Sequence, residues 1–301
     1  MQQNTIPLEQ QKFTQSQQGS ESVQWLQDDL LIRNWLTTQN NTVRTKIEPS
    51  ASAVEAALRD FKANLPKSTS YEKFLSNDHV TDADIHAMMA LIVRRTNMQA
   101  YLSDQVHSPA YQVQARGITL DTEQHANDVL NQLRKGGDFA KLAKEKSLDS
   151  STKDKGGDFG WLAQGQYAIN YAQSLSVTVD NWLFDPARKV NELSPVLKEN
   201  GTFHIVQITG INRSRAIDSA TISSLKTKAL DIWLLQQKAL PGTKITEIDQ
   251  SKMLDASNMP PNLPSAAPGT NPNTGLPDGG FPGGDGGTGG TGSTGGTNGQ
   301  P

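Results

Sequence analysis

The spacing of the apolar residues changes near Tyr111, and this change restricts the folds that are open to the chain. Before Tyr111, apolar residues recur every three or four positions, which is typical of amphipathic helices. From Tyr111 to Leu120 the side chains fall into two alternating sets, as they do in a β-strand. The sequence therefore predicts a helical N-terminal part followed by a part that is built on a sheet.

The N-terminal part predicts three main helices. The first covers about residues 23–35 and the second about residues 50–65. The third begins at Thr81, which is a good N-cap residue. Pro109 ends this third helix, because a proline disfavours helical backbone in the residue before it.

The second part predicts the element order β, α, α, β, α, β, β. Asp121 or Thr122 caps a helix after the first strand, and Asp138 caps a second, shorter helix. The last strand covers Phe203–Ile208 and is rich in β-branched residues. Strands and helices that intermix in this way favour the α+β class, with one antiparallel sheet covered by helices.

The stretch Ser147–Gln166 connects the short helix to an internal strand. Its first half is polar, and Gly156-Gly157 supplies backbone conformations that other residues resist, which indicates a tight turn. Phe159 and Trp161 follow two positions apart. Alternate residues of a strand share a face, so we expect these two aromatic side chains to be buried together.

A final helix is predicted over about Ser219–Leu240, and we expect it to pack on the N-terminal helices. Both ends of the chain have polar or Gly/Pro-rich compositions that are typical of disorder. The predicted organisation is a disordered polar N-terminus (1–21), a helical domain (22–110), a sheet domain (111–213), a C-terminal helix that packs on the helical domain (214–246) and a disordered Gly/Pro/Thr-rich tail (247–301).

The composition excludes several classes of function. The 28 basic and 31 acidic residues give a net charge of −3, which argues against nucleic acid as a main partner. The absence of cysteine excludes disulfides, thiolate metal sites and a cysteine nucleophile. No run approaches the roughly 18 apolar residues of a membrane span, and residues 1–20 lack the pattern of a signal peptide. We therefore expect membrane contact only through an anchor that this sequence does not contain.

Short motifs between Gln112 and Gly210 are specific in combination, because their order and spacing form one pattern. In chain order they are Ala115-Arg116-x-Ile118, Gly137-Asp138-Phe139-x-x-Leu142-Ala143, Ser147-x-Asp149, Lys155-Gly156-Gly157-Asp158-Phe159-Gly160-Trp161, Gly165-Gln166, Ser194-Pro195-Val196 and Gly201-Thr202-Phe203-His204-Ile205-Val206. This pattern resembles the parvulin (PpiC or rotamase) family of peptidyl-prolyl cis-trans isomerases. The surrounding plan resembles the PrsA/SurA class of extracytoplasmic foldases. In that class a parvulin-like sheet domain is inserted between the N-terminal helices and the C-terminal helix of a SurA-like, chaperone-like helical domain.

The resemblance implies an isomerase that twists X-Pro bonds without covalent chemistry and assists the folding of exported proteins. Amide resonance sets the uncatalysed barrier at about 18–20 kcal/mol, and a catalyst must favour the twisted amide over both planar forms. Such a reaction needs no cofactor and no metal. The implied partners are unfolded or proline-containing polypeptides, and the implied location is extracytoplasmic, either secreted or membrane-anchored and facing outward.

The resemblance also implies two sets of site residues. The catalytic set, which forms a polar wall near the carbonyl and nitrogen of the X-Pro bond, is Asp149 and His204. The substrate-binding set, which lines the proline pocket and its surroundings, is Tyr167, Tyr171, Phe184, Gly117, Gln166 and Phe203.

Three departures from the family pattern support an alternative function. Gly117 stands where the family has a histidine, so the usual histidine pair is broken. The segment Ala172–Asn181 is longer than usual, and Gly201–His204 is one residue longer than the usual Gly-Tyr-His. The alternative is a chaperone with a parvulin fold and a degenerate site, which binds unfolded polypeptides without isomerising them. A third hypothesis is an architectural surface protein that acts through its Gly/Thr/Pro tail.

Overall fold

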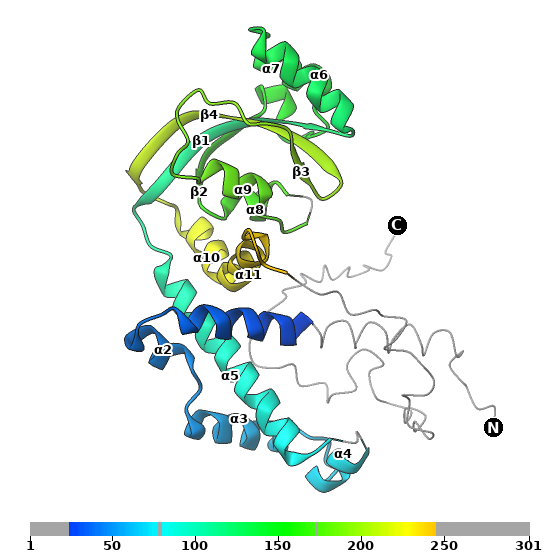
Figure 1. Cartoon of the computed structure of the whole chain (residues 1–301), viewed down its shortest axis with the longest axis vertical. Coiled ribbons are helices and arrows are strands. Elements are labelled where there is room, and N and C mark those ends of the chain that lie inside the picture. The colour runs from blue at the N-terminus through cyan, green and yellow to red at the C-terminus, as the bar shows by residue number, and fades with distance from the viewer. Residues whose placement is uncertain (1–23, 78–79, 173, 245–301) are drawn as a thin grey trace, which may run out of the picture.

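The computed structural model describes residues 24–244, apart from residues 78–79 and 173. The predicted disordered segments 1–21 and 247–301 lie outside the described residues. Within the described part, a group of helices and an antiparallel sheet with its own covering helices lie at opposite ends of the molecule (Figure 1). The prediction of an α+β fold, with N-terminal and C-terminal helices on either side of a sheet in sequence, is confirmed.

The helical end is built from short capped helices and one long one. Its elements are a helix over residues 24–37, α2 (Asn41–Ile47), α3 (Ala51–Ala63), α4 (Tyr71–Asn77) and α5 (Asp82–Gln105). The Ser50 side chain accepts a hydrogen bond from the first turn of α3, and Thr81 forms a capping box with Asp84 at the start of α5. The sequence did not predict α2, because its seven residues are too few to show a helical period.

The sheet has four antiparallel strands in the order β2-β1-β4-β3. Its strands and the helices between them are β1 (Ala110–Leu120), α6 (Glu123–Arg134), α7 (Phe139–Lys146), the 3-10 turn η1 (Lys153–Lys155), β2 (Asp158–Ala163), α8 (Gln166–Asn170), α9 (Thr178–Leu183), β3 (Leu197–Glu199) and β4 (Thr202–Arg215). The two longest strands, β1 and β4, lie side by side at the centre. The predicted caps Thr122 and Asp138 begin α6 and α7.

Each face of the sheet has its own hydrophobic core. On one face, Ile118 of β1 and Ile205 of β4 pack against apolar side chains of α6 and α7. On the other face, Val113 and Val206 pack against Tyr167 of α8 and against residues of α9. In Figure 1, α6 and α7 lie above the sheet and α8 and α9 lie below it. The second core is the one that carries the predicted site residues.

The prediction that Phe159 and Trp161 share a face is wrong. Trp161 pairs with Gln114 in the ladder, and its ring lies 5.1 Å from the guanidinium carbon of Arg215. Phe159 instead packs in the core that contains Val113. Val113 and Gln114 are neighbours along β1 and therefore point to opposite faces of the sheet.

A β-bulge causes this change of face. Ala115 pairs with Gly160, but the next residue of β1, Arg116, pairs with Asp158, so that Phe159 has no partner across the ladder. Gly160 has φ of 71°, which glycine adopts at no steric cost. The extra residue changes the face of the sheet to which the following side chains of β2 point. The Phe159 ring is thereby directed into the core.

The predicted final helix is two helices, α10 (Ser219–Thr227) and α11 (Ala229–Ala239). In a continuous helix, the N–H of Leu230 would donate to the carbonyl of Lys226. Here the side-chain amide of Gln99, on α5, lies between them: its Nε2 donates to the Lys226 oxygen at 2.6 Å and its Oε1 accepts from the Leu230 N–H at 3.0 Å. Inserted side chains of this kind interrupt a helix.

The C-terminal helices contact both ends of the molecule. Leu230 and Trp233 of α11 share a core with Ile32 of the first described helix and Met98 of α5. Ile232 packs against Ala168 of α8 and against Val177, the N-cap of α9. In Figure 1, α10 and α11 accordingly lie between the sheet and α5. The domain boundaries themselves stay predictions.

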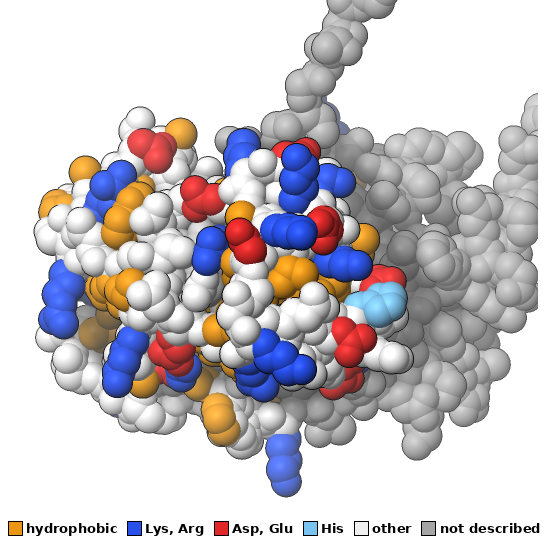
Figure 2. Space-filling model, turned by 90° about the horizontal axis from the view of Figure 1, so that it is seen from above, with side chains coloured by type: hydrophobic (Ala, Val, Ile, Leu, Met, Phe, Trp, Pro, Cys, Tyr) orange, Lys and Arg blue, Asp and Glu red, His pale blue; other side chains and the backbone are white. Residues whose placement is uncertain are grey.

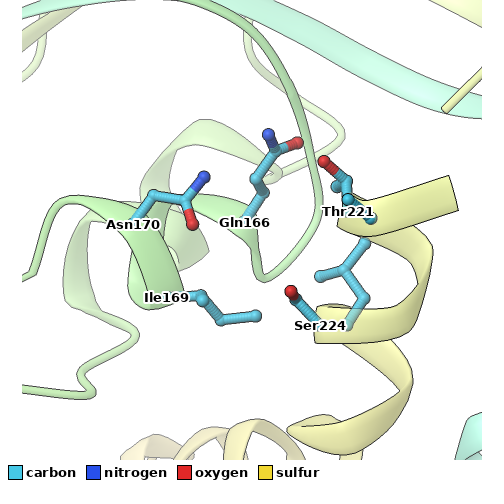
Figure 3. A pocket seen from close by; sticks show the side chains of 7 residues that line it. Gln166, Ile169, Asn170, Thr221 and Ser224 are labelled. Atoms are coloured by element: carbon cyan, nitrogen blue, oxygen red, sulfur yellow. The ribbon is translucent and has the colours of Figure 1, made fainter. Parts of the chain in front are cut away.

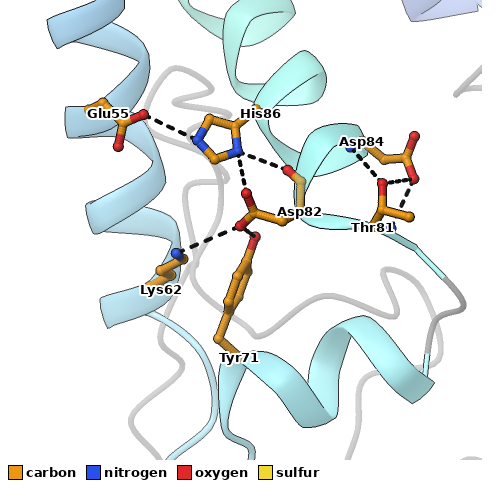
Figure 4. Close-up of polar contacts among 7 residues, drawn as sticks. All are labelled: Glu55, Lys62, Tyr71, Thr81, Asp82, Asp84 and His86. Atoms are coloured by element: carbon orange, nitrogen blue, oxygen red, sulfur yellow. Dashed lines mark hydrogen bonds and ion pairs between the residues drawn. The ribbon is translucent and has the colours of Figure 1, made fainter.

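A polar cluster joins α3, α4 and α5 at the far end of the helical group (Figure 4). His86 contacts the backbone oxygen of Asp82 through Nδ1 and the carboxylate of Glu55 through Nε2, at 2.8 and 3.1 Å. Tyr71 donates to the Asp82 carboxylate, and Lys62 lies 3.9 Å from the centre of the Tyr71 ring. The backbone bond to Asp82, followed by the two carboxylates, raises the pKa of His86 above its ordinary value.

The His86 contacts predict a pH-dependent stability. Because the folded pKa is raised, protonated His86 stabilises the fold below its unfolded pKa of about 6.5, and this contribution is lost as the pH rises through the folded pKa. We expect His86→Gln to lower the free energy of unfolding at about pH 5.5 and to change it much less at about pH 8.5. Urea unfolding at the two pH values measures this difference. His107→Gln is the control, because the His107 ring contacts the backbone oxygen of Gln105 and not a carboxylate; equal pH profiles for the two variants would contradict the prediction.

Candidate active site

His204 lies on β4 with its ring directed toward α8, and its side chain is buried among hydroxyl groups. Its Nε2 lies 2.8 Å from the Thr202 hydroxyl, and its Nδ1 lies 3.2 Å from the Thr119 hydroxyl and 3.4 Å from the Tyr167 hydroxyl. Burial lowers the pKa of His204, against the opposing effect of the Glu199 carboxylate and a second carboxylate nearby. The ring is therefore neutral at neutral pH.

Asp149 lies in the loop that follows α7 and is half-buried. Burial would raise the pKa of Asp149, but hydrogen bonds from Ser151 and Thr152 outweigh it and lower the pKa. The carboxylate is therefore ionised. The negative charge of Asp149 acts to raise the pKa of His204, Tyr167 and Tyr171. The described contacts include no hydrogen bond between Asp149 and His204.

Three aromatic rings form a cluster beside His204. Phe159 lies edge-on to Tyr167 with ring centres 5.2 Å apart and tilted against Tyr171 at 4.7 Å. Tyr167 is 1% exposed, whereas Tyr171 is partly exposed and donates a hydrogen bond to the Phe159 carbonyl. Burial raises the pKa of both tyrosines. Both hydroxyls therefore keep their protons and act as neutral donors.

Gly117 pairs with Val206 in the ladder and faces the same core. A Cβ atom at this position would lie 2.4 Å from Cζ and 2.7 Å from Cε2 of Phe159, and 3.3 Å from Cγ1 of Val206. The Phe159 ring, turned inward by the bulge, therefore occupies the space that a side chain at residue 117 would need. The Gly117 N–H also donates to the carbonyl of Gly157 at 2.8 Å, so the two backbones are in direct contact.

The remaining predicted residues are dispersed. Phe184 is partly buried beside the core on the α8 and α9 face of the sheet, and it packs edge-on against Tyr111. Phe203 packs with the α6 and α7 core, because it neighbours His204 along β4 and must point to the other face. The Gln166 Oε1 atom accepts a hydrogen bond from the Ala163 N–H at 3.0 Å. The structure thus brings five predicted residues together, namely Asp149, His204, Tyr167, Tyr171 and Gly117, and separates Gln166 and Phe203 from them.

Gln166 lines a cavity of about 220 Å³ between α8 and α10. In Figure 3, Gln166 and Asn170 of α8 face Thr221 and Ser224 of α10 across this space. The cavity lies where the sheet end meets the C-terminal helices, and His204 is not among the residues that line it.

Four polar residues close to His204 or Tyr167 were not predicted from the sequence. Thr119 and Thr202 supply hydroxyl partners for the His204 ring. Glu199 and Asp180 are buried carboxyl groups at 3% and 1% exposure. Burial raises the pKa of Asp180 to about 7, partly offset by backbone N–H groups of α8 and its N-cap. Alternation along β1 and β4 could have placed the two threonines on this face; nothing in the sequence near Asp180 indicates its burial.

The surface over α6 and α7 carries charges of both signs. Figure 2 shows basic and acidic side chains interspersed on this face. Among the residues that the structure describes, no group of three or more histidine or acidic side chains could hold a metal ion. None of the described helices is both long and apolar enough to cross a membrane.

The fold and these motifs coincide with a known family. Residues 112–212 match the family model described as "PPIC-type PPIASE domain". The sheet domain is therefore a parvulin-type domain, and the resemblance found from the motifs is confirmed.

Three curated relatives are similar to this part of the chain. A parvulin-like PPIase of Rickettsia bellii is 37% identical over 97 residues, which are 32% of this chain and 32% of that protein. The foldase protein PrsA of Caldanaerobacter subterraneus subsp. tengcongensis is 34% identical over 106 residues, 35% of this chain and 31% of that protein. The periplasmic chaperone PpiD of Escherichia coli K12 is 36% identical over 129 residues, 40% of this chain and 19% of that protein. The chain thus matches about a third of the length of the first two relatives and less of the third.

The packing of Phe159 against Gly117 predicts that even a methyl group is too large at residue 117. We expect Gly117→Ala to lower the free energy of unfolding by about 1–3 kcal/mol, because the methyl group must displace the Phe159 ring. Phe159→Leu in the same chain should recover part of this loss, since Leu reaches less far. A double-mutant cycle by urea unfolding measures the coupling; additive effects of the two substitutions would refute the contact.

Proposed function

We propose that the domain over residues 111–213 catalyses the cis-trans isomerisation of X-Pro bonds in unfolded, exported polypeptides. The observation that carries this proposal is the cluster of Asp149, His204 and the tyrosines within a segment that matches the PPIC-type family model. Two further points support a role in folding outside the cytoplasm: one relative is named a foldase and another a periplasmic chaperone.

The partly exposed side chains in and beside the cluster would contact the polypeptide. Tyr171 and Phe184 offer partly exposed aromatic surface for the proline ring, and Leu148, next to Asp149, is 56% exposed. Tyr167 and His204 lie beneath this surface and are buried. In this proposal Asp149 faces the X-Pro amide, while His204 and Tyr167 form the buried base of the site.

The Asp149 carboxylate could lower the rotation barrier by electrostatics. Resonance makes the carbonyl oxygen of a planar amide more negative, and rotation about the C–N bond reduces this charge. An anionic side chain beside that oxygen therefore destabilises the planar forms more than the twisted one. The lowered pKa of Asp149 keeps this side chain charged.

The first test measures isomerisation by the full chain, using NMR exchange on a short proline-containing peptide. We expect acceleration by the wild type, and a loss of about tenfold or more in kcat/KM for Asp149→Ala, which corresponds to about 1.4 kcal/mol or more of transition-state stabilisation. Asp154→Ala is the matched control, because Asp154 is an exposed carboxylate of the same loop. A wild type that gives no acceleration, or an Asp149→Ala variant as active as the control, would reject the proposal.

The alternative function is that of a chaperone that binds unfolded polypeptides without isomerising them. The observation in its favour is that Phe159 fills the space beside Gly117, where the family has a histidine. In this case we expect the full chain to suppress aggregation of an unfolded client protein while it fails to accelerate isomerisation. Light scattering of the client, with wild type and Asp149→Ala in parallel, makes the comparison; suppression that disappears in Asp149→Ala would count against a purely holding role.

A further inference from the structure

Three hydroxyl groups around His204 determine which of its ring nitrogens carries the proton. The Thr202 Oγ1 atom lies 2.9 Å from the backbone oxygen of Glu199 and 2.8 Å from Nε2 of His204. A hydroxyl has one proton to donate, and a carbonyl oxygen can only accept. Thr202 therefore donates to Glu199 and accepts from His204, so the proton of the neutral ring is on Nε2.

Nδ1 of His204 is then the acceptor of the ring. Its neighbours are the hydroxyls of Thr119 at 3.2 Å and Tyr167 at 3.4 Å. Thr119 is the closer of the two and lies directly across the ladder from His204. Gly117 lies on the same face of β1 as Thr119 but offers the ring no polar group.

The backbone of Thr119 is bonded to the loop that carries Asp149. Its N–H donates to the Ser147 hydroxyl at 3.1 Å, and its carbonyl accepts from the Leu148 N–H at 2.8 Å. The same Ser147 hydroxyl accepts from the N–H of Asp149 at 3.2 Å. Thr119 therefore contacts His204 through its side chain and the Asp149 loop through its backbone.

We propose that Thr119 is a positioning residue, which holds neutral His204 as the Nε2–H tautomer together with Thr202 and fixes the distance between His204 and the Asp149 loop. The significance of this role for catalysis rests on the proposed isomerase function. The role itself, a hydrogen bond from Thr119 to Nδ1, is a property of the folded chain and can be tested without an activity. The burial of the site favours this arrangement, because an unpaired ring nitrogen there would be costly.

The test uses the full chain labelled with ¹⁵N-histidine and records long-range ¹H–¹⁵N correlations at neutral pH. The His204 signals are assigned among the five histidines by their loss in His204→Gln. We expect the wild type to show a protonated Nε2 and a hydrogen-bonded, unprotonated Nδ1. In Thr119→Val, which keeps the backbone bonds and the shape of the side chain, the Nδ1 signal should move toward that of an unbonded nitrogen, because only the longer contact to the Tyr167 hydroxyl, at 3.4 Å, is then left. Thr119→Ser should restore the wild-type signal.

The activity measurement adds a second readout. If the wild type isomerises the test peptide, Thr119→Val should lower kcat by about three- to tenfold with little change in KM, as expected for one hydrogen bond. Thr119→Ser should recover most of kcat, and Thr178→Val, at an exposed threonine of α9, should leave it unchanged. A wild-type Nδ1 that carries the proton, or a Thr119→Val spectrum identical to wild type, would overturn the inference. An inactive wild type with the expected spectra would reject the proposed function and leave the positioning role supported.

Discussion

The pairing of β1 with β4 places both hydrophobic cores of the sheet domain and the residues of the site. These two strands form the longest ladder of the sheet and bring together residues that are 83 to 105 positions apart in the chain, such as Thr119 and His204. Because side chains alternate along both strands, the ladder supplies one apolar surface to α6 and α7 and another to α8 and α9. The site lies on the second surface, so its geometry follows from the register of this pair.

Close contact between backbones explains why glycine is needed where β2 begins. A Cβ atom at Gly157 would lie 2.2 Å from the Gly117 carbonyl, and the residue has φ of 81°. The bulge at Gly160 then turns Phe159 into the core against Gly117. The interior beside His204 is thereby filled by an aromatic ring. Among the described residues, the hydroxyls of Thr119, Thr202 and Tyr167 are the side-chain groups within hydrogen-bond distance of the His204 ring.

The C-terminal helices link the two ends of the molecule through both packing and hydrogen bonds. Trp233 packs on the N-terminal helices, while the neighbouring Ile232 packs on α8 and on the N-cap of α9. The Gln99 amide replaces one helical hydrogen bond between α10 and α11, so the Lys226 oxygen and the Leu230 N–H are both paired at the break. The position of the sheet domain relative to α5 therefore depends on a helix pair that the sequence presents as one helix.

Features that arise from short-range rules could be predicted from the sequence. Helical period, the caps at Thr81 and Asp138, and the order of the strands along the chain follow from neighbours within a few residues. The residue types, order and spacing of the motifs gave the resemblance to parvulin-type domains. Tertiary structure decided the side on which Phe159 lies and the partners of His204, because a bulge and a strand register depend on contacts between distant segments. The burial of Asp180 has the same cause: its residue type favours solvent, and only the packing of α8, α9 and β3 encloses it.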